Sequence, residues 1–362
     1  MDKRLATCAA LLGLALPAAA QEGNLNIYNW SDYIADGTLQ KFSAETGINV
    51  VYDVYDSNEV LEAKLLAGSS GYDIVVPTSS YLRRQIGGDI YMPLDRSKIP
   101  NWDNLDADMM ERAAAYDEGN EHSIIYMWGT NGFGYNVEMV RERLGEDAPT
   151  DSWDLIFDPE IAEQLADCGL TLLDSGTEMM PLALHYLGYD PGTTDSAELE
   201  EAGALLSSIR PYVRYFHSSQ YISDLANGEV CVSVGWSGDV FIAADRAEAA
   251  GQGIEIAYTI PKEGTIQWFD MMAIPSDAPN PEAAHAFINF ILQPEIIAEI
   301  TNYVFYPNAV PASKEFIDPE IANNPEIYPP QEVLDNLFPS PARDPRSLRT
   351  VTRLWTQVKT GQ

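Results

Sequence analysis

The sequence contains few cationic side chains and few histidines. It has 21 lysines and arginines against 55 aspartates and glutamates, which gives a formal net charge of −34 over 362 residues. Nucleic-acid binding needs a basic face for the phosphates, so this charge argues against that class of protein. The negative charge fits either solubility, including in a salty environment, or a field that attracts a cationic ligand.

Motifs for metal, nucleotide or nucleophilic chemistry are missing. Neither HxxH nor HExxH spacing occurs among the four histidines, which are His122, His185, His217 and His285. The sequence contains no Walker motif and no GxGxxG, so no metal and no cofactor is expected. The stretch GWSGD at 235–239 approaches the GxSxG elbow of serine hydrolases but lacks its final glycine. We therefore predict a protein that is not an enzyme.

Long apolar runs are also missing, apart from the first twenty residues. Lys3 and Arg4 precede an apolar stretch that ends in three alanines, Ala18–Ala20. This pattern is typical of a secretory signal peptide, which we assign to residues 1–20. Lipidation at Cys8 is disfavoured, because the apolar stretch mostly follows this cysteine. No later run approaches the roughly 20 apolar residues of a membrane span, so the mature chain is expected to be soluble.

Cysteine is scarce, and two cysteines remain after removal of residues 1–20, namely Cys168 and Cys231. An even pair in an exported chain most often forms a disulfide, although two buried free thiols are the alternative. Neither cysteine belongs to a CxxC or Cys/His signature, so a catalytic thiol is not expected.

The N-terminal part alternates strand and helix patterns. Helical patterns start at Thr38 and at Asn58, and the second has Asp56 or Ser57 as its N-cap and ends before Gly68. Strands are expected at LNIY (25–28), NVVYDVY (49–55) and DIVVP (73–77). This order predicts βαβ units and a parallel α/β sheet, whose ligands bind beyond the carboxyl ends of the strands. The segments that follow these strand ends, and that should face one crevice, are YNWSDY (28–33), DSNE (56–59) and PTSS (77–80).

The middle of the chain, about 135–265, reads as more helical, with a strand at EVCVSVGW (229–236). An α/β pattern returns with WFDMMAIP (268–275) and a helix over 281–292. A second lobe inserted into the first explains this order. Asp344 and Pro345 start a last helix, whose apolar stripe favours a helix that closes a core over one that docks a partner.

One unit recurs along the chain: an aromatic residue beside a carboxylate, in segments that we expect to be loops. Its instances are Trp30 and Tyr33 around Asp32, Trp236 before Asp239, Trp268 and Phe269 before Asp270, Phe305–Tyr306, and Glu178 in DSGTEM. Lysine and arginine are nearly absent from these segments, whereas a site for an anionic group needs them or free backbone donors. Aromatic faces with carboxylates suit a cation on an apolar stem. A single such unit is explained by a core aromatic beside a solvated acid, but several at strand ends point to a site.

With these residues in view, the chain resembles the periplasmic polyamine-binding proteins of bacterial ABC importers over nearly all of its mature length. The motifs that carry the resemblance are YNWSDYI, YDVYDSNEVLEAKLLAG, DIVVPTSSYL, DSWDLIFDP, RYFHSSQYISDLANGEVCV, GWSGDV, VFYPNA and IYPP. The resemblance implies a two-lobe type II periplasmic binding protein fold, in which each lobe is a sheet flanked by helices. The implied lobes are 21–134 with 271–316, and 135–270 with 317–362. The hinge crossings would lie near Gly132–Gly134, near Asp270–Met272 and after Tyr306.

The resemblance also implies the ligand contacts. Trp30 and Trp236 would sandwich the methylene chain, and Trp268 and Tyr306 would complete an aromatic box. The residues around one amine and along the near wall would be Ser31, Asp32, Tyr33, Thr78 and Ser80. The residues that hold charged nitrogens would be Glu178, Asp239 and Asp270. Cys168 and Cys231 fall where the putrescine-binding branch has its disulfide.

The function that follows is capture of putrescine or spermidine in the periplasm and delivery to the permease subunits of an ABC transporter, by a monomer. Two positions depart from the putrescine-binding branch of the family. Thr78 stands where that branch has serine. Trp268 stands where that branch has phenylalanine and the spermidine-binding branch has tryptophan. We expect both ligands to bind, with a lean towards spermidine. The alternatives are a polyamine receptor that docks a membrane sensor, and a periplasmic enzyme acting on amines, which no cofactor motif supports.

Overall fold

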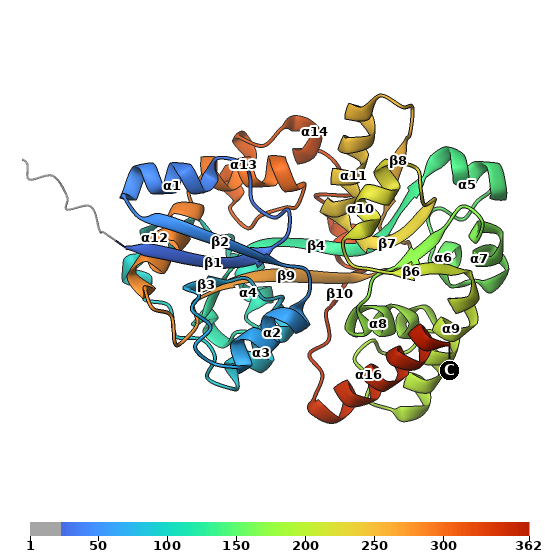
Figure 1. The fold of residues 1–362 in the computed structure, drawn as a ribbon, viewed down its shortest axis with the longest axis horizontal. Helices are drawn as coiled ribbons and strands as arrows, with labels where there is room; N and C mark the ends of the chain where they lie inside the picture. Colours follow the sequence, from blue (N-terminus) through green and yellow to red (C-terminus); the bar gives the residue numbers. More distant parts are fainter. Residues whose placement is uncertain (1–22, 362) are drawn as a thin grey trace, which may run out of the picture.

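The computed structural model describes residues 23–361, so the predicted signal peptide and Cys8 lie outside the described residues. Within 23–361, none of the helices combines the length and the apolar character that crossing a membrane requires. The predicted α/β class is confirmed: strands and helices alternate along most of the chain (Figure 1).

The first elements follow the pattern expected from the sequence. They are β1 (Asn24–Trp30), α1 (Thr38–Thr46), β2 (Asn49–Tyr55), α2 (Asn58–Leu66), β3 (Ile74–Val75) and α3 (Ser79–Ile86). Strands β2, β1 and β3 are parallel, so their carboxyl ends share one edge. Ser57, one of the two N-cap candidates, caps α2 by accepting from the Val60 amide at 3.3 Å. Gly47 ends α1 in the left-handed region, with φ of 76°.

Two long strands connect the two parts of the molecule. They are β4 (Ser123–Asn136) and β9 (Ile266–Ala273), in the strand order β2-β1-β3-β9-β4-β7-β5-β6. Strand β4 pairs with β9 up to Thr130 and with β7 from Asn131 onwards. A side chain at Gly132 would come within 2.2 Å of the Thr259 carbonyl oxygen, so this crossing requires a glycine. We call the two parts the β1 half and the β7 half.

Helices cover both faces of the sheet in each half (Figure 1). In the β1 half these are α1 to α3 together with α4 (Ala107–Ala113), α12 (Pro281–Ile291) and α13 (Pro294–Val304). The β7 half contains the strands β5 (Leu170–Leu172), β6 (Val213–Phe216), β7 (Val232–Trp236) and β8 (Ile256–Thr259). Its helices are α5 (Val137–Leu144), α6 (Asp154–Phe157), α7 (Pro159–Leu165), α8 (Gly176–Tyr186), α9 (Ser196–Ile209), α10 (Gln220–Ala226) and α11 (Ser237–Ala250).

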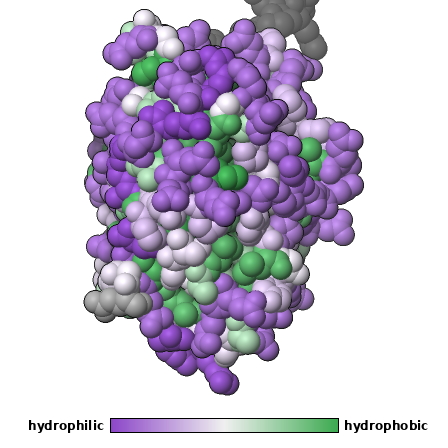
Figure 2. Space-filling model, turned by 90° about the vertical axis from the view of Figure 1, so that its right-hand side faces the viewer, coloured by the Kyte–Doolittle hydropathy of each residue, from purple (hydrophilic) through white to green (hydrophobic). Residues whose placement is uncertain are grey.

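The C-terminal segment returns across the molecule to the β7 half (Figure 1). Its elements are α14 (Pro319–Ala322), α15 (Gln331–Leu334), β10 (Phe338–Pro339) and α16 (Pro345–Thr360). Asp344 caps α16 by accepting from the Arg346 and Ser347 amides, as expected. The apolar stripe of α16 packs against α8 and α9, which confirms that this helix closes a core. The surface at this end of the molecule is mostly hydrophilic, with small scattered apolar patches (Figure 2).

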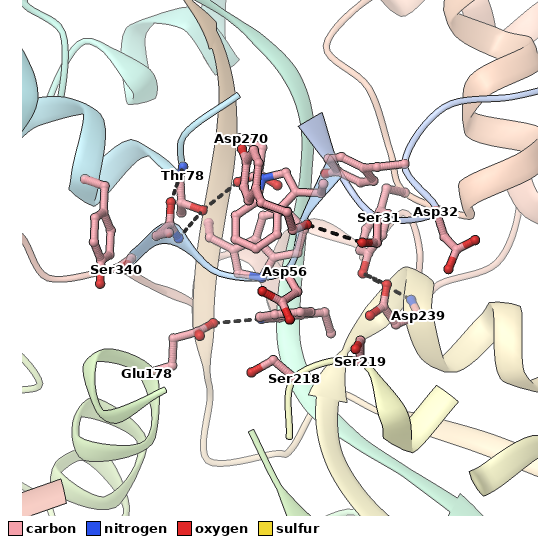
Figure 3. A pocket seen from close by; sticks show the side chains of 18 of the residues that line it. Ser31, Asp32, Asp56, Thr78, Glu178, Ser218, Ser219, Asp239, Asp270 and Ser340 are labelled. Atoms are coloured by element: carbon pink, nitrogen blue, oxygen red, sulfur yellow. Dashed lines mark hydrogen bonds between the residues drawn. The ribbon is translucent and has the colours of Figure 1, made fainter. Parts of the chain in front are cut away.

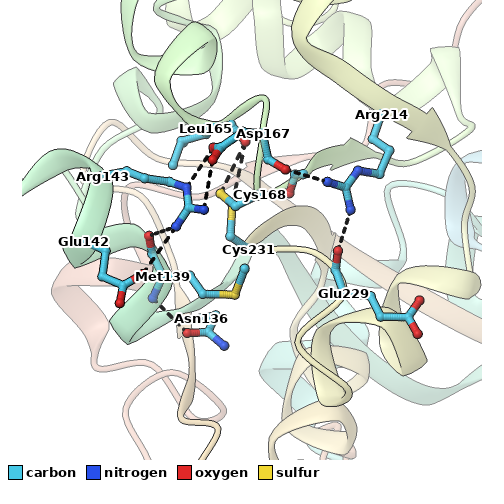
Figure 4. Close-up of a disulfide and its surroundings, with 11 residues drawn as sticks. Asn136, Met139, Glu142, Arg143, Leu165, Asp167, Cys168, Arg214, Glu229 and Cys231 are labelled. Carbon is cyan, nitrogen blue, oxygen red and sulfur yellow. Dashed lines mark hydrogen bonds and ion pairs between the residues drawn. A yellow bond between two sulfur atoms is a disulfide. The ribbon is translucent and has the colours of Figure 1, made fainter.

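The two mature cysteines form a disulfide, as the sequence favoured (Figure 4). Cys168 precedes β5 and Cys231 precedes β7, and these two strands pair in parallel from Leu170 and Val232. The bond therefore joins the amino ends of neighbouring strands. Trp236, at the carboxyl end of β7, lies roughly 16 Å further along the strand at about 3.3 Å per residue.

Replacing both cysteines, as Cys168→Ala with Cys231→Ala, should lower the free energy of unfolding by about 4 kcal/mol, because the bond closes a loop of 63 residues. Urea unfolding of the oxidised protein and of the double variant measures the difference. Reduced wild-type protein is the control and should match the variant. Equal unfolding midpoints for oxidised and reduced protein would contradict this account.

Candidate ligand-binding site

A cavity opens between the two halves at the carboxyl ends of β1 and β7 (Figure 3). All the residues that the sequence proposed for a site line this one cavity: Trp30, Ser31, Asp32, Tyr33, Thr78, Ser80, Glu178, Trp236, Asp239, Trp268, Asp270 and Tyr306. They come from segments separated by up to 276 positions in the chain, because β4 and β9 hold the two halves side by side.

Two tryptophans meet across the cavity from opposite halves. Trp30 ends β1, and its indole nitrogen donates to the Val76 carbonyl oxygen at 2.8 Å. Trp236 ends β7, and its ring centroid lies 5.9 Å from that of Trp30 at an interplanar angle of 71°. The rings thus touch edge to face. The two rings are therefore not parallel in this conformation.

Asp239 lies in the first turn of α11, where its carboxylate is held by two tyrosines. The hydroxyl of Tyr306 donates to Oδ1 at 2.8 Å, and that of Tyr221 donates to Oδ2 at 2.9 Å. Desolvation raises the pKa of Asp239 to about 6, although the two hydroxyls oppose the shift. Tyr306 comes from the β1 half, so this hydrogen bond links the halves.

Asp270 is buried in the middle of β9, with 5% of its surface exposed. The Thr78 hydroxyl donates to its Oδ1 at 2.7 Å, and Thr78 is itself held by the Asn58 side chain. Burial raises the pKa of Asp270 to about 7, with smaller raising contributions from Glu178 and Asp239. The carboxyl group therefore titrates near neutral pH.

Glu178 lies in the first turn of α8, on the opposite wall from Asp239. Its Oε1 accepts from the Trp236 indole nitrogen at 2.7 Å and from the Asn131 amide at 3.1 Å. Burial raises the pKa of Glu178, and these donors oppose the shift. The carboxylate is thus fixed by residues on two different strands of the sheet.

Asp32 occupies the rim of the cavity. Its backbone is in the left-handed region, with φ of 53°, and half of its side chain is exposed. Its Oδ1 lies 3.6 Å from the guanidinium of Arg246 on α11. Asp32 is therefore the one predicted site carboxylate that has a cationic neighbour within ion-pair distance among the described residues.

The remaining walls are aromatic. Trp268 lies against Tyr306 with ring centroids 5.3 Å apart, and Tyr33 lies against the same tyrosine at 5.4 Å. A Cβ at Gly129 would come within 2.6 Å of the Trp268 ring, so the strand shared by the two halves holds this indole closely. Tyr55 and Tyr81 extend the wall and were not singled out from the sequence.

The cavity has the chemistry of a cation receptor. Its lining contains no lysine and no arginine, while Glu178, Asp239 and Asp270 have no cationic partner within ion-pair distance among the described residues. Unpaired desolvated carboxylates are unfavourable, and a ligand that brings positive charge relieves this. The aromatic faces suit the methylene groups and the cationic ends of such a ligand. Residues 23–361 contain no cluster of three or more His, Cys, Asp or Glu side chains arranged to hold a metal ion.

The expectation that the aromatic–carboxylate units lie in loops is wrong for three of them. Glu178 and Asp239 belong to first helical turns, and Asp270 belongs to a central strand. These rigid elements fix the carboxylates more firmly than loops do. Cavity residues that sequence reasoning did not select are Tyr55, Asp56, Asn58, Tyr81, Thr177, Ser218, Ser219, Ile222, Ile266 and Ser340. Asp56 and Asn58 belong to a segment expected to face the crevice, whereas Ser340 carries no local signal.

Comparison with known proteins gives consistent matches. The family of bacterial extracellular solute-binding proteins matches residues 38–329. The putrescine-binding periplasmic protein SpuD of Pseudomonas aeruginosa is 55% identical, over 95% of this chain and 94% of the relative. The putrescine-binding periplasmic protein PotF of Escherichia coli is 49% identical, over 95% and 93%. A putative spermidine/putrescine ABC transporter from Listeria monocytogenes has a similar structure, with a TM-score of 0.84 and 34% identity, over 94% of this chain and 99% of that chain.

Proposed function

The chain belongs to the bacterial extracellular solute-binding proteins, and from this premise we propose that it captures polyamines between its two halves and delivers them to an ABC transporter. The fold is that of the type II periplasmic binding proteins. The observation that carries the proposal is the set of three desolvated carboxylates, Glu178, Asp239 and Asp270, in an aromatic cavity without lysine or arginine. The relatives' names, which specify putrescine or spermidine, support the same ligand class.

In this proposal the carboxylates receive the ammonium groups and the aromatic rings enclose the methylene chain. Polyamine nitrogens resemble the lysine ammonium, with a pKa of about 10.4, so they are cationic at neutral pH. A chain held between two parallel rings needs a ring separation of about 7 Å, which is two carbon contacts of about 3.5 Å each. Trp30 and Trp236, now 5.9 Å apart and tilted, therefore move apart and align when the ligand enters.

The same proposal covers export and division into lobes. Residues 1–20 direct the chain to the periplasm, where it acts as a monomer and docks the permease subunits. The lobes are 21–134 with 271–316, and 135–270 with 317–362. Strands β4 and β9 are the sheet strands that run between them. A receptor that docks a membrane sensor uses the same lobes and is the second candidate, and uptake of labelled polyamine by a deletion strain separates the two.

Ligand preference depends on Thr78 and Trp268. Trp268 offers a larger aromatic face than phenylalanine does, beside Asp270, and so favours a longer triamine. We therefore propose that both putrescine and spermidine bind, with spermidine preferred.

Calorimetry of the purified mature chain with putrescine, cadaverine, spermidine and spermine tests the function. We expect binding of putrescine and spermidine at one site per chain, and no binding of glutamate, which brings carboxylates to an acidic cavity. Absence of binding for all four amines, or binding of glutamate, would overturn the proposal. Mass spectrometry of the same mixtures tests for turnover, and consumption of the amine would indicate an enzyme instead.

A further inference from the structure

Asn131 is a fully buried polar residue outside the predicted set, at the point where β4 changes partner. Its neighbour Thr130 pairs with Gln267 of β9, whereas Asn131 pairs with Trp236 of β7. Asn131 is therefore the first residue of β4 that pairs with a strand of the β7 half. Close approaches at Gly129 and Gly132 on either side keep the strand in place.

The side-chain amide of Asn131 has a defined orientation. Its Nδ2 donates at 3.1 Å to the Glu178 Oε1 that also accepts from Trp236. With the amide reversed, Oδ1 of Asn131 would face Oε1 of Glu178, and neither oxygen can donate. The contact with the carboxylate therefore fixes which amide atom points towards Glu178. The Oδ1 atom is buried and has no hydrogen-bond partner among the described residues.

This arrangement is unfavourable for folding alone. A buried amide with an unpaired oxygen costs free energy, whereas a leucine of similar size carries no polar atom of its own that could be left unsatisfied. The benefit of Asn131 must therefore lie in what it holds. It holds Glu178, whose carboxylate in turn orients the Trp236 indole.

We propose that Asn131 is a positioning residue for the cationic end of the ligand. It stands on β4, the strand shared by the two halves, and fixes the Glu178 carboxylate. Through this carboxylate it also fixes the Trp236 indole. This role rests on the proposed polyamine function. The two donors occupy Oε1 and leave Oε2 of Glu178 for the ligand. Asn131 sits where β4 changes partner, next to the strand that carries Trp236.

A double-mutant cycle tests the role with putrescine as the probe. Asn131→Leu should raise the Kd about 10- to 100-fold, the range for losing a hydrogen bond to a charged group. On the Glu178→Gln background, the same substitution should change the Kd less than about threefold, because Asn131 acts through Glu178. Thr130→Val, which removes the neighbouring buried hydroxyl on the same strand, is the matched control and should leave the Kd unchanged.

The outcomes separate this inference from the proposed function. An unchanged Kd in Asn131→Leu, or equal losses on both backgrounds, would overturn the positioning role while wild-type binding stands. A wild type that fails to bind any polyamine overturns the function itself. If Asn131→Leu does not fold, Asn131→Ala removes the same donor with a smaller side chain, and the same cycle applies to it.

Discussion

Asp239→Asn should weaken putrescine binding by about 30- to 5,000-fold, or about 2–5 kcal/mol, which is the range for truncating one partner of a buried charge pair. The substitution keeps the shape of the side chain but removes the charge that faces the cavity from α11. The Tyr306 and Tyr221 hydroxyls, which now donate at 2.8 and 2.9 Å, can rotate to serve an amide. Calorimetry at pH 8, where Asp239 is ionised, measures the change.

Asp245→Asn is the matched control, since Asp245 lies on the same helix and is exposed. It makes the same change in net charge and should leave the Kd within about twofold, because exposed charges at a distance are screened by salt. Asp239→Asn should also retain or increase the stability of the ligand-free protein, since it removes a desolvated carboxylate without a close cation. Wild-type affinity in Asp239→Asn would remove this residue from the site.

Much of the fold was predictable because local signals and tertiary context agree. Alternating apolar runs and caps placed β1, α1, β2 and α2 almost to the residue, and Asp344 marked the start of α16. The change of strand partner along β4 is different. It depends on close approaches of Thr259 and Tyr258 to Gly132, which come from a strand more than a hundred residues away. Periodicity contains no information on such contacts.

The candidate site also has features that the sequence predicts and features that only the fold shows. Aromatic residues beside carboxylates identified the cavity lining, because these side chains are unusual at strand ends and occur repeatedly. Their elements were assigned wrongly for Glu178, Asp239 and Asp270, since a carboxylate in a first helical turn or a buried strand has no local signature of its own. The partners that hold the carboxylates are Asn131, which is 47 positions from Glu178 in the chain, and Tyr221, which is 18 positions from Asp239. Only the folded arrangement gives them a role.

The carboxyl groups of the site also predict a strong pH dependence of binding. The pKa of Asp270 is raised to about 7 and that of Asp239 to about 6, mainly by desolvation. A dicationic ligand binds the ionised forms, so both groups must lose their protons in the complex. Between pH 8 and pH 5 the Kd for putrescine should therefore rise on the order of 100- to 1,000-fold, and about one proton should be released per ligand bound near pH 6.5.

The ligand-free protein should show the opposite trend. Both carboxyl groups have a folded-state pKa above the unfolded value, so the folded protein holds more protons than the unfolded chain between about pH 4 and pH 7. The contribution of these groups to the free energy of unfolding is therefore present at acidic pH and is lost as the pH rises through about 6 to 7. Saturating putrescine should reverse this pH trend. Ligand binding stabilises the folded state more at pH 8, where the Kd is lowest, than at pH 5.

Thermal unfolding with and without putrescine from pH 5 to pH 8, together with calorimetry in buffers of different ionisation enthalpy, measures both trends. Asp270→Asn provides the internal comparison, since it removes the group with the higher pKa and should reduce proton release near pH 7 to almost none. A Kd that stays constant from pH 8 to pH 5, with no buffer-dependent enthalpy, would show that the ligand does not meet these carboxylates. If stability falls with rising pH without putrescine and rises with pH in its presence, the desolvated carboxylates have both expected effects. They destabilise the cavity when it holds no cation, and they make it selective for cationic ligands.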